Sequence, residues 1–193
     1  RSGGTTIAHE AATFGHTGVL QWVLSVAEVG PDLLKRQADS GRTIAHAAAI
    51  HHQLHVLQWI ANTPGLGTTL LTTSRNNGWT IAHEAAARGY TRVLQWILSA
   101  AAYNRRRRRR RPVGADLLKR QAHNGNTFAH TAARNNQIGV LEWIADTREL
   151  GTALLTTSRP DGWTIAHEAA SVGRCTDCRR RSSTAAPKHV PRT

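Results

Sequence analysis

The sequence lacks the features that define several protein classes. Its 193 residues include no methionine and only two cysteines, so a disulfide-stapled secreted scaffold is excluded and a reducing compartment, cytoplasmic or nuclear, is expected. No uninterrupted apolar run approaches the ~18 residues of a membrane span. Because an initiator methionine is absent, we expect the sequence to be part of a longer protein, and the lack of a signal peptide says nothing about secretion.

Basic charge is concentrated in two segments, although the formal net charge is +13. Seven of the 25 Lys and Arg residues form one block, Arg105 to Arg111, and six more lie in residues 174–193 beside one acidic residue. The rest of the chain holds 12 basic and 11 acidic residues, so it is nearly neutral. An ordinary nucleic-acid-binding domain instead gathers its basic residues on one folded face.

An internal repeat organises the chain. The motif Gly-x-Thr-x-Ala-His-x-Ala-Ala occurs five times at a spacing of 37 residues, except for one spacing of 47 that contains the arginine block. Two further motifs, Val-Leu-Gln/Glu-Trp and Leu-Leu, follow each of the first four copies. Residues 57–86 and 141–170 are identical at 23 of 30 positions, which indicates duplication of a two-unit block. The motif histidines are His9, His46, His83, His130 and His167.

These spacings define one array over residues 1–173, followed by a basic tail, 174–193, that we expect to be disordered. The predicted units cover about 4–40, 41–77, 78–124, 125–161 and a partial unit, 162–173. The third unit includes an Arg-rich insertion at 104–112. Such short repeats cannot bury their apolar surface alone, so the units must stack on one another.

Each unit is predicted to be a helix–turn–helix followed by a hairpin. Thr6 is a suitable N-cap for an Ala-rich helix over Ile7 to Phe14, which should end at Gly15. The apolar positions between Val19 and Val23 fall on one face of a second helix. Asn76-Asn77-Gly78 is typical of a tight turn in which glycine has a positive φ.

The repeat resembles the ankyrin repeat. The family pattern Gly-x-Thr-Pro-Leu-His-x-Ala-Ala-x-x-Gly-His-x-x-Val-Val aligns with residues 4–20, and the match recurs in register over about residues 4–173. Ile stands at the family's Pro, Ala at its Leu, and each unit has four extra residues around the Leu-Leu pair. The resemblance implies an all-α solenoid with short β-hairpin or loop fingers, acting as a non-catalytic scaffold or adaptor that binds another protein.

The same resemblance places partner binding on the fingertips and on the exposed side of the first helices. Trp79 and Trp163 directly follow the turn glycine, and Trp is enriched in binding hot spots. The alternative is that each ring lies flat on the adjacent hairpin. A second set of tryptophans, Trp22, Trp59, Trp96 and Trp143, is expected to pack between repeats. The candidate residues are Arg42, Trp79, Asn126 and Trp163 at the fingertips and Glu10, Glu84, Arg88, Arg134 and Glu168 on the first helices.

The sequence offers no catalytic, cofactor or metal site. His-Glu occurs three times, but the second histidine of a His-Glu-x-x-His zinc helix is absent each time. Histidines on stacked elements about 8–10 Å apart cannot share an ion with ~2 Å bonds, and the resemblance implies that each ties the neighbouring Thr. Cys175 and Cys178 have only His189 nearby, short of a four-ligand zinc site.

The arginine block leaves three interpretations open. It is a tolerated low-complexity expansion, a nuclear-import signal, or an electrostatic contact to nucleic acid or another polyanion. The block therefore supports an alternative function, a basic nucleic-acid-binding or nuclear-import adaptor. A further alternative is that the repeats are the scaffold of a larger enzyme or channel.

Deleting residues 104–112 separates these interpretations. We expect the seven arginines, Arg105, Arg106, Arg107, Arg108, Arg109, Arg110 and Arg111, to bind any polyanion weakly and without sequence preference. The log of affinity for single strands should fall with log salt by up to about 0.7 per phosphate contact. The deletion should abolish this binding in a salt titration and leave the fold intact. Tenfold discrimination between nucleic-acid sequences at ~0.15 M salt would contradict this expectation.

Overall fold

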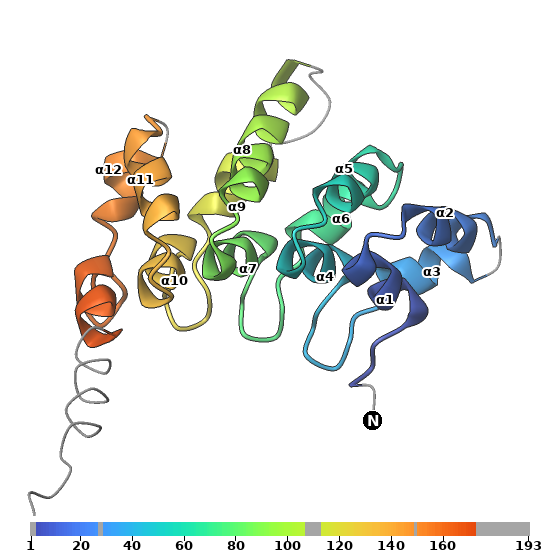
Figure 1. Cartoon of the computed structure of the whole chain (residues 1–193), viewed down its shortest axis with the longest axis horizontal. Coiled ribbons are helices and arrows are strands. Elements are labelled where there is room, and N and C mark those ends of the chain that lie inside the picture. The colour runs from blue at the N-terminus through green and yellow to red at the C-terminus, as the bar shows by residue number, and fades with distance from the viewer. Residues whose placement is uncertain (1–2, 27–28, 107–112, 149, 173–193) are drawn as a thin grey trace, which may run out of the picture.

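The computed structural model describes residues 3–26, 29–106, 113–148 and 150–172 (Figure 1). Their helices stack side by side in a curved row, and the loops between units project from one edge of that row. None of the described residues is in a β-strand, so the fingers are turns. The predicted tail, 174–193, and Arg107 to Arg111 lie outside the described residues.

Three helices recur in each complete unit. The first helices are α1 (Ile7–Phe14), α4 (Ile44–Ile50), α7 (Ile81–Arg88) and α10 (Phe128–Arg134). The second helices are α2 (Thr17–Ser25), α5 (Leu54–Asn62), α8 (Thr91–Arg106) and α11 (Ile138–Asp146). The third helices are α3 (Gly30–Lys35), α6 (Gly67–Thr72), α9 (Val113–Lys119) and α12 (Gly151–Leu155). Residues 165–172 form one more first helix.

The third helix is a correction to the two-helix unit predicted from the sequence. It carries the Leu-Leu pair, and its second leucine is buried in the first three units, with Leu34 and Leu118 fully buried and Leu71 7 % exposed. The four residues that each unit has beyond the usual ~33 lie around this helix. The recurrence of the Leu-Leu pair in all four complete units was the signal for it.

The predicted helix boundaries at Thr6, Gly15 and Gly89 are confirmed. Thr6 is the N-cap of α1 with an extended backbone, and α1 ends at Gly15 with φ 80°. Gly89 ends α7 in the same way with φ 77°. Both glycines adopt the left-handed conformation that side-chain-bearing residues rarely accept.

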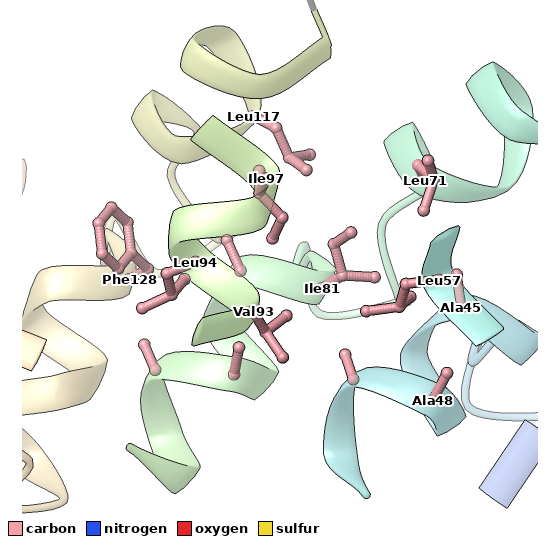
Figure 2. Close-up of a cluster of buried hydrophobic side chains, with 14 of the residues drawn as sticks. Ala45, Ala48, Leu57, Leu71, Ile81, Val93, Leu94, Ile97, Leu117 and Phe128 are labelled. Atoms are coloured by element: carbon pink, nitrogen blue, oxygen red, sulfur yellow. The ribbon is translucent and has the colours of Figure 1, made fainter. Parts of the chain in front are cut away.

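Alanine lets the first helices approach one another closely. Ala45, Ala82 and Ala129 are fully buried, and larger side chains such as Leu57, Ile81 and Leu94 fill the space between layers (Figure 2). In the second, third and fourth units the position where the family has Pro holds Ile44, Ile81 and Phe128, each at most 1 % exposed, whereas Ile7 in the first unit is 56 % exposed. These large apolar side chains are therefore buried directly beside the alanines that stand at the family's leucine position.

The second-helix tryptophans do not all pack as predicted. Trp59, Trp96 and Trp143 are partly buried against the core, whereas Trp22 is 63 % exposed. The three partly buried residues belong to units with a described unit before them, and Trp22 does not. The prediction of a packed ring is therefore wrong for Trp22 in the described chain.

The motif histidines join neighbouring units. Nε2 of His46 lies 3.1 Å from the carbonyl oxygen of Trp79, in the finger of the next unit, and His83 makes the same contact to Asn126 at 3.0 Å. Because a carbonyl oxygen only accepts, Nε2 carries the proton and Nδ1 is the acceptor. The hydroxyl of Thr43 then donates to Nδ1 of His46 at 2.9 Å. His9 and His130 repeat this arrangement.

Burial keeps these imidazoles neutral. Desolvation lowers the pKa of His46 and of His83 to about 4, although the hydrogen bond to the carbonyl works in the opposite direction. The pKa values of His9 and His130 are also lowered, again mainly by burial. Protonating Nδ1 would remove the acceptor that receives the threonine hydroxyl, so folding and protonation of these rings oppose each other.

Stability should therefore decrease in mild acid. In the unfolded chain His46 and His83 take up protons near pH 6.5, whereas in the folded chain they do so near pH 4. The stabilisation is complete above about pH 6.5 and is lost as pH falls towards 4, by about 1.4 kcal/mol per pH unit for each histidine. Urea unfolding at pH 7.5, 6 and 5 measures the slope. The control, His46→Gln with His83→Gln, should make the slope shallower, since only His9 and His130 then remain to contribute, and an equal slope in that variant would contradict the assignment.

Candidate functional site

The two tryptophan-bearing fingers share one turn geometry. In the finger before α7, the N–H of Arg75 donates to the carbonyl of Trp79 at 2.8 Å, and Asn77 Oδ1 accepts from the N–H of Trp79 at 3.0 Å. Gly78 lies between them with φ 82°. The finger before residues 165–172 repeats these bonds with Arg159, Asp161 and Trp163 at 2.8 and 3.0 Å. The predicted glycine turns are confirmed.

Adjacent fingers are linked along the edge of the array. The backbone N–H of Asn76 donates to the carbonyl of Ser40 at 3.2 Å, and His123 N–H donates to Asn77 at 3.1 Å. Together with the contact from His46, these bonds hold the backbone of the Trp79 finger from both neighbouring fingers. In the last finger Pro160 stands at the position of Asn76 and has no N–H to donate, and His130 contacts the carbonyl of Trp163 at 3.3 Å.

Each fingertip tryptophan ring lies against a motif histidine. The ring centroids of Trp79 and His83 are 6.1 Å apart, and those of Trp163 and His167 are 5.3 Å apart. Trp163 remains 38 % exposed and Trp79 is half-buried. Both rings thus contact the first helix of their own unit and also reach the surface.

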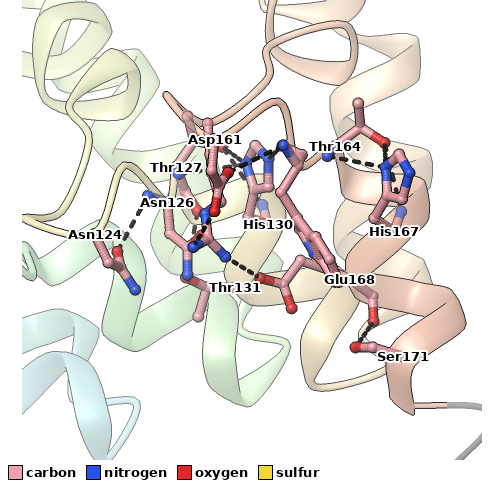
Figure 3. Close-up of polar contacts among 12 residues, drawn as sticks. Asn124, Asn126, Thr127, His130, Thr131, Asp161, Thr164, His167, Glu168 and Ser171 are labelled. Carbon is pink, nitrogen blue, oxygen red and sulfur yellow. Dashed lines mark hydrogen bonds and ion pairs between the residues drawn. The ribbon is translucent and has the colours of Figure 1, made fainter.

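An arginine lies beside each tryptophan finger and pairs with a buried glutamate. Arg75 Nη1 donates to Glu84 Oε1 at 2.5 Å, and Arg159 Nη1 donates to Glu168 Oε1 at 3.2 Å. Arg159 also pairs with Asp161 at 2.8 Å. Figure 3 labels Asp161 and Glu168 among the polar contacts around this finger. The glutamate side chains are only 6 % and 7 % exposed. Sequence reasoning did not single out either arginine, although both recur nine residues before a motif glutamate.

Three of the nine candidate residues are not surface residues. Glu84 and Glu168 were expected on an exposed helix face, but the arginines cover their carboxylates. Asn126 was expected at an exposed fingertip but is 3 % exposed, and Pro160 and Arg159 of the next finger lie close to its neighbour Gly125. Of the rest, Glu10, Arg88 and Arg134 are exposed, and Arg42 is half-buried. Arg105 and Arg106 end α8, and the other block residues lie outside the described residues.

Two surface cavities lie along the fingers and the first helices. A cavity of about 340 Å³ is lined by Arg134, Arg159, Asp161, Trp163, Glu168 and Ser171. Another, of about 490 Å³, is lined by Gly3, Thr5, Ala38, Asp39, Ser40, Arg42 and Arg75. The structure therefore brings Arg134, Trp163 and Glu168 together and places Arg42 in a separate site. Both cavities combine cationic and anionic side chains.

The described part of the chain contains no cluster of three or more His, Cys, Asp or Glu residues that could hold a metal ion. In His9, His46, His83 and His130 both ring nitrogens already have partners within the protein. Over the same described residues, no helix has the length and apolar character needed to cross a membrane.

The sequence was compared with models of known protein families, and the match agrees with the stacked helices of the structure. A family model of ankyrin repeats in three copies matches residues 8–107, just over half of the chain. The chain belongs to the ankyrin-repeat family. Members of this family are generally protein–protein interaction modules and are typically non-catalytic. No curated protein matches closely enough to be named as a relative of this ankyrin-repeat chain.

The Arg75–Glu84 pair is expected to hold the finger on its first helix. Arg75→Met leaves the Glu84 carboxylate buried without its cation, which should lower the free energy of unfolding by roughly 2–4 kcal/mol. Adding Glu84→Gln to that variant should restore most of the loss, because no uncompensated charge remains. Urea denaturation of the single and double variants measures both values. A single variant within 0.5 kcal/mol of the parent chain would contradict this account.

Proposed function

We propose that this ankyrin-repeat chain is a non-catalytic adaptor that binds a protein partner through its fingertips and first-helix surface, with Trp79 and Trp163 as anchors. The proposal rests on a contact that does not depend on the fingertip side chain.

At each fingertip, the motif histidine of the preceding unit contacts the backbone carbonyl of the residue that follows the turn glycine, whatever that residue is. Arg42 and Asn126 accept at 2.9 and 3.0 Å just as Trp79 and Trp163 do at 3.1 and 3.3 Å.

The indole rings are therefore not needed for this inter-unit bond. A tryptophan side chain offers a large contact area and has only two rotatable bonds, so it loses little conformational freedom on binding, and Trp is common in hot spots. At the last finger, Trp163 lies in one cavity with the exposed Arg134, while Arg159 in the same cavity is already paired with Glu168 and Asp161. That combination suits a partner segment that offers an apolar side chain next to a carboxylate or a backbone carbonyl.

The two tryptophan fingers also form a pair. They are separated by 84 residues, or two units, and share the same arginine, glutamate and histidine contacts. Two equivalent anchors on one surface favour an extended partner that contacts both. Binding at the second anchor would then be intramolecular and would gain from a high effective concentration.

Replacing the anchors tests this function. Trp79→Ala and Trp163→Ala should each weaken binding of a partner identified by affinity purification by about 2 kcal/mol or more, roughly 30-fold in Kd. Circular dichroism should stay unchanged, because the fingertip carbonyl remains. The matched control is Trp22→Ala, which removes an exposed tryptophan far from the fingers and should keep the partner. A folded double variant that binds with parental affinity would contradict the proposal.

A further inference from the structure

The cavity of about 490 Å³ at the fingers before α1, α4 and α7, which we call the Arg42 cavity, contains an arginine without an acidic partner among the described residues. Arg42 follows the turn glycine of the finger before α4 and is half-buried. In the part of the chain that the structure describes, its side chain forms no ion pair and no hydrogen bond. Arg75 and Arg159, in contrast, each pair with a buried glutamate.

The fold does not require an arginine at this position. The backbone carbonyl of Arg42 accepts from Nε2 of His9 at 2.9 Å and from the N–H of Ala38 at 2.9 Å, and both bonds are independent of the side chain. A charged side chain that lines a cavity and is not used by the fold is available to a ligand. The residues at the equivalent position of the other fingers are Thr5, Trp79, Asn126 and Trp163.

Two buried donors in the Arg42 cavity lack an acceptor. Nε of Arg42 and Nε of Arg75 are buried, and neither has a hydrogen-bond partner among the described residues. Buried N–H groups are nearly always paired in folded proteins, so these donors favour an acceptor that enters the cavity. Ser40, which is exposed, lines the same cavity, and its hydroxyl has no hydrogen bond within the described residues. This hydroxyl is a further donor for an incoming oxygen atom.

The charges around the cavity favour a ligand with a single negative charge. Glu84 already neutralises Arg75, so Arg42 is the unpaired cation among the described residues that line the cavity. Asp39 also lines it, but Asp39 is exposed and forms no ion pair with either arginine there, so water screens its charge. A carboxylate, with one charge and two oxygens, matches the planar fork of one guanidinium. A phosphate dianion would meet two carboxylates without a second unpaired cation.

We propose that the Arg42 cavity binds a carboxylate side chain of a protein partner, with Arg42 as the bidentate donor and Ser40 as an additional donor. The inference rests on the proposed function, because the carboxylate belongs to the partner that the fingers bind. It adds a site that is separate from the cavity of Trp163 and gives that partner a chemistry: an acidic residue that reaches the finger before α4.

Two capped tripeptides, acetyl-Ala-Asp-Ala-amide and acetyl-Ala-Asn-Ala-amide, test the charge requirement on the full chain. The readout is the Nε–H resonance of Arg42 in NMR spectra, assigned by its loss in Arg42→Gln. The Asp peptide should shift this resonance saturably with a Kd of roughly millimolar order, as suits one charge-assisted pair at a surface. The Asn peptide should not shift it at the same concentrations. Asp39→Asn should tighten binding of the Asp peptide by about two- to threefold, because a like charge is removed.

Arg42→Gln and Arg42→Lys separate a bidentate site from charge alone. Both variants should fold, because the fingertip bonds use the backbone carbonyl, and circular dichroism checks this. Followed at the backbone N–H of Ser40, the Gln variant should bind the Asp peptide at least about tenfold more weakly, and the Lys variant should lie in between. Ser40→Ala should weaken binding by about two- to threefold. The matched control, Arg134→Gln, removes an exposed arginine of the other cavity and should bind like the parent chain.

Three results would overturn the carboxylate site. They are equal binding of the Asn and Asp peptides, parental affinity in Arg42→Gln or Arg42→Lys, and tenfold tighter binding of a phosphoserine peptide of the same length, which would make phosphate the ligand. If Trp79→Ala and Trp163→Ala still lose the partner, any of these results leaves the proposed function in place. Partner binding that survives both tryptophan variants contradicts the proposed function instead, whereas saturable, Arg42-dependent binding of the Asp peptide supports the carboxylate site.

Discussion

The hydrogen bond from a motif histidine to the next finger's carbonyl is the interaction on which the array depends. It is made at a fixed place in each junction, at 2.9 to 3.3 Å, by rings that are almost fully buried. Apolar contacts alone would let helices slide along each other, since dispersion and hydrophobic burial are not directional. A directional bond sets the register between units, and the threonine N-cap fixes the tautomer that can make it.

The alanine-rich first helices and the histidine bond support each other. Close approach of the first helices brings the imidazole within reach of the next finger, and the buried ring then occupies space that a larger apolar side chain would otherwise fill. The same closeness leaves no water to satisfy Nε2 or the carbonyl, so loss of either partner would leave a buried polar atom unpaired. The apolar packing of the first helices and the histidine hydrogen bond therefore depend on each other at each junction.

Local signals in the sequence were sufficient for much of the fold. The cap threonines, the helix-ending glycines and the turn glycines act through the backbone of their own segment, so α1 and α7 begin and end where the sequence predicts. The third helix was missed because a Leu-Leu pair has no period to distinguish helix from loop. The burial of Glu84 and Glu168 was missed because it depends on Arg75 and Arg159, whose reach across the finger is a tertiary property. The exposure of Trp22 likewise follows from its place in the array and not from its motif.

The arginine insertion joins the array at the end of α8 and the start of α9, on the edge opposite the fingers (Figure 1). A ligand held by the fingers and a polyanion held by the insertion would therefore approach from opposite sides and would not compete for space. The thickness of the repeat would keep them apart, and the neutral body between them would transmit little electrostatic influence. In such an arrangement the array would act as a spacer, and the length of its second and third helices would set the distance between the two ligands.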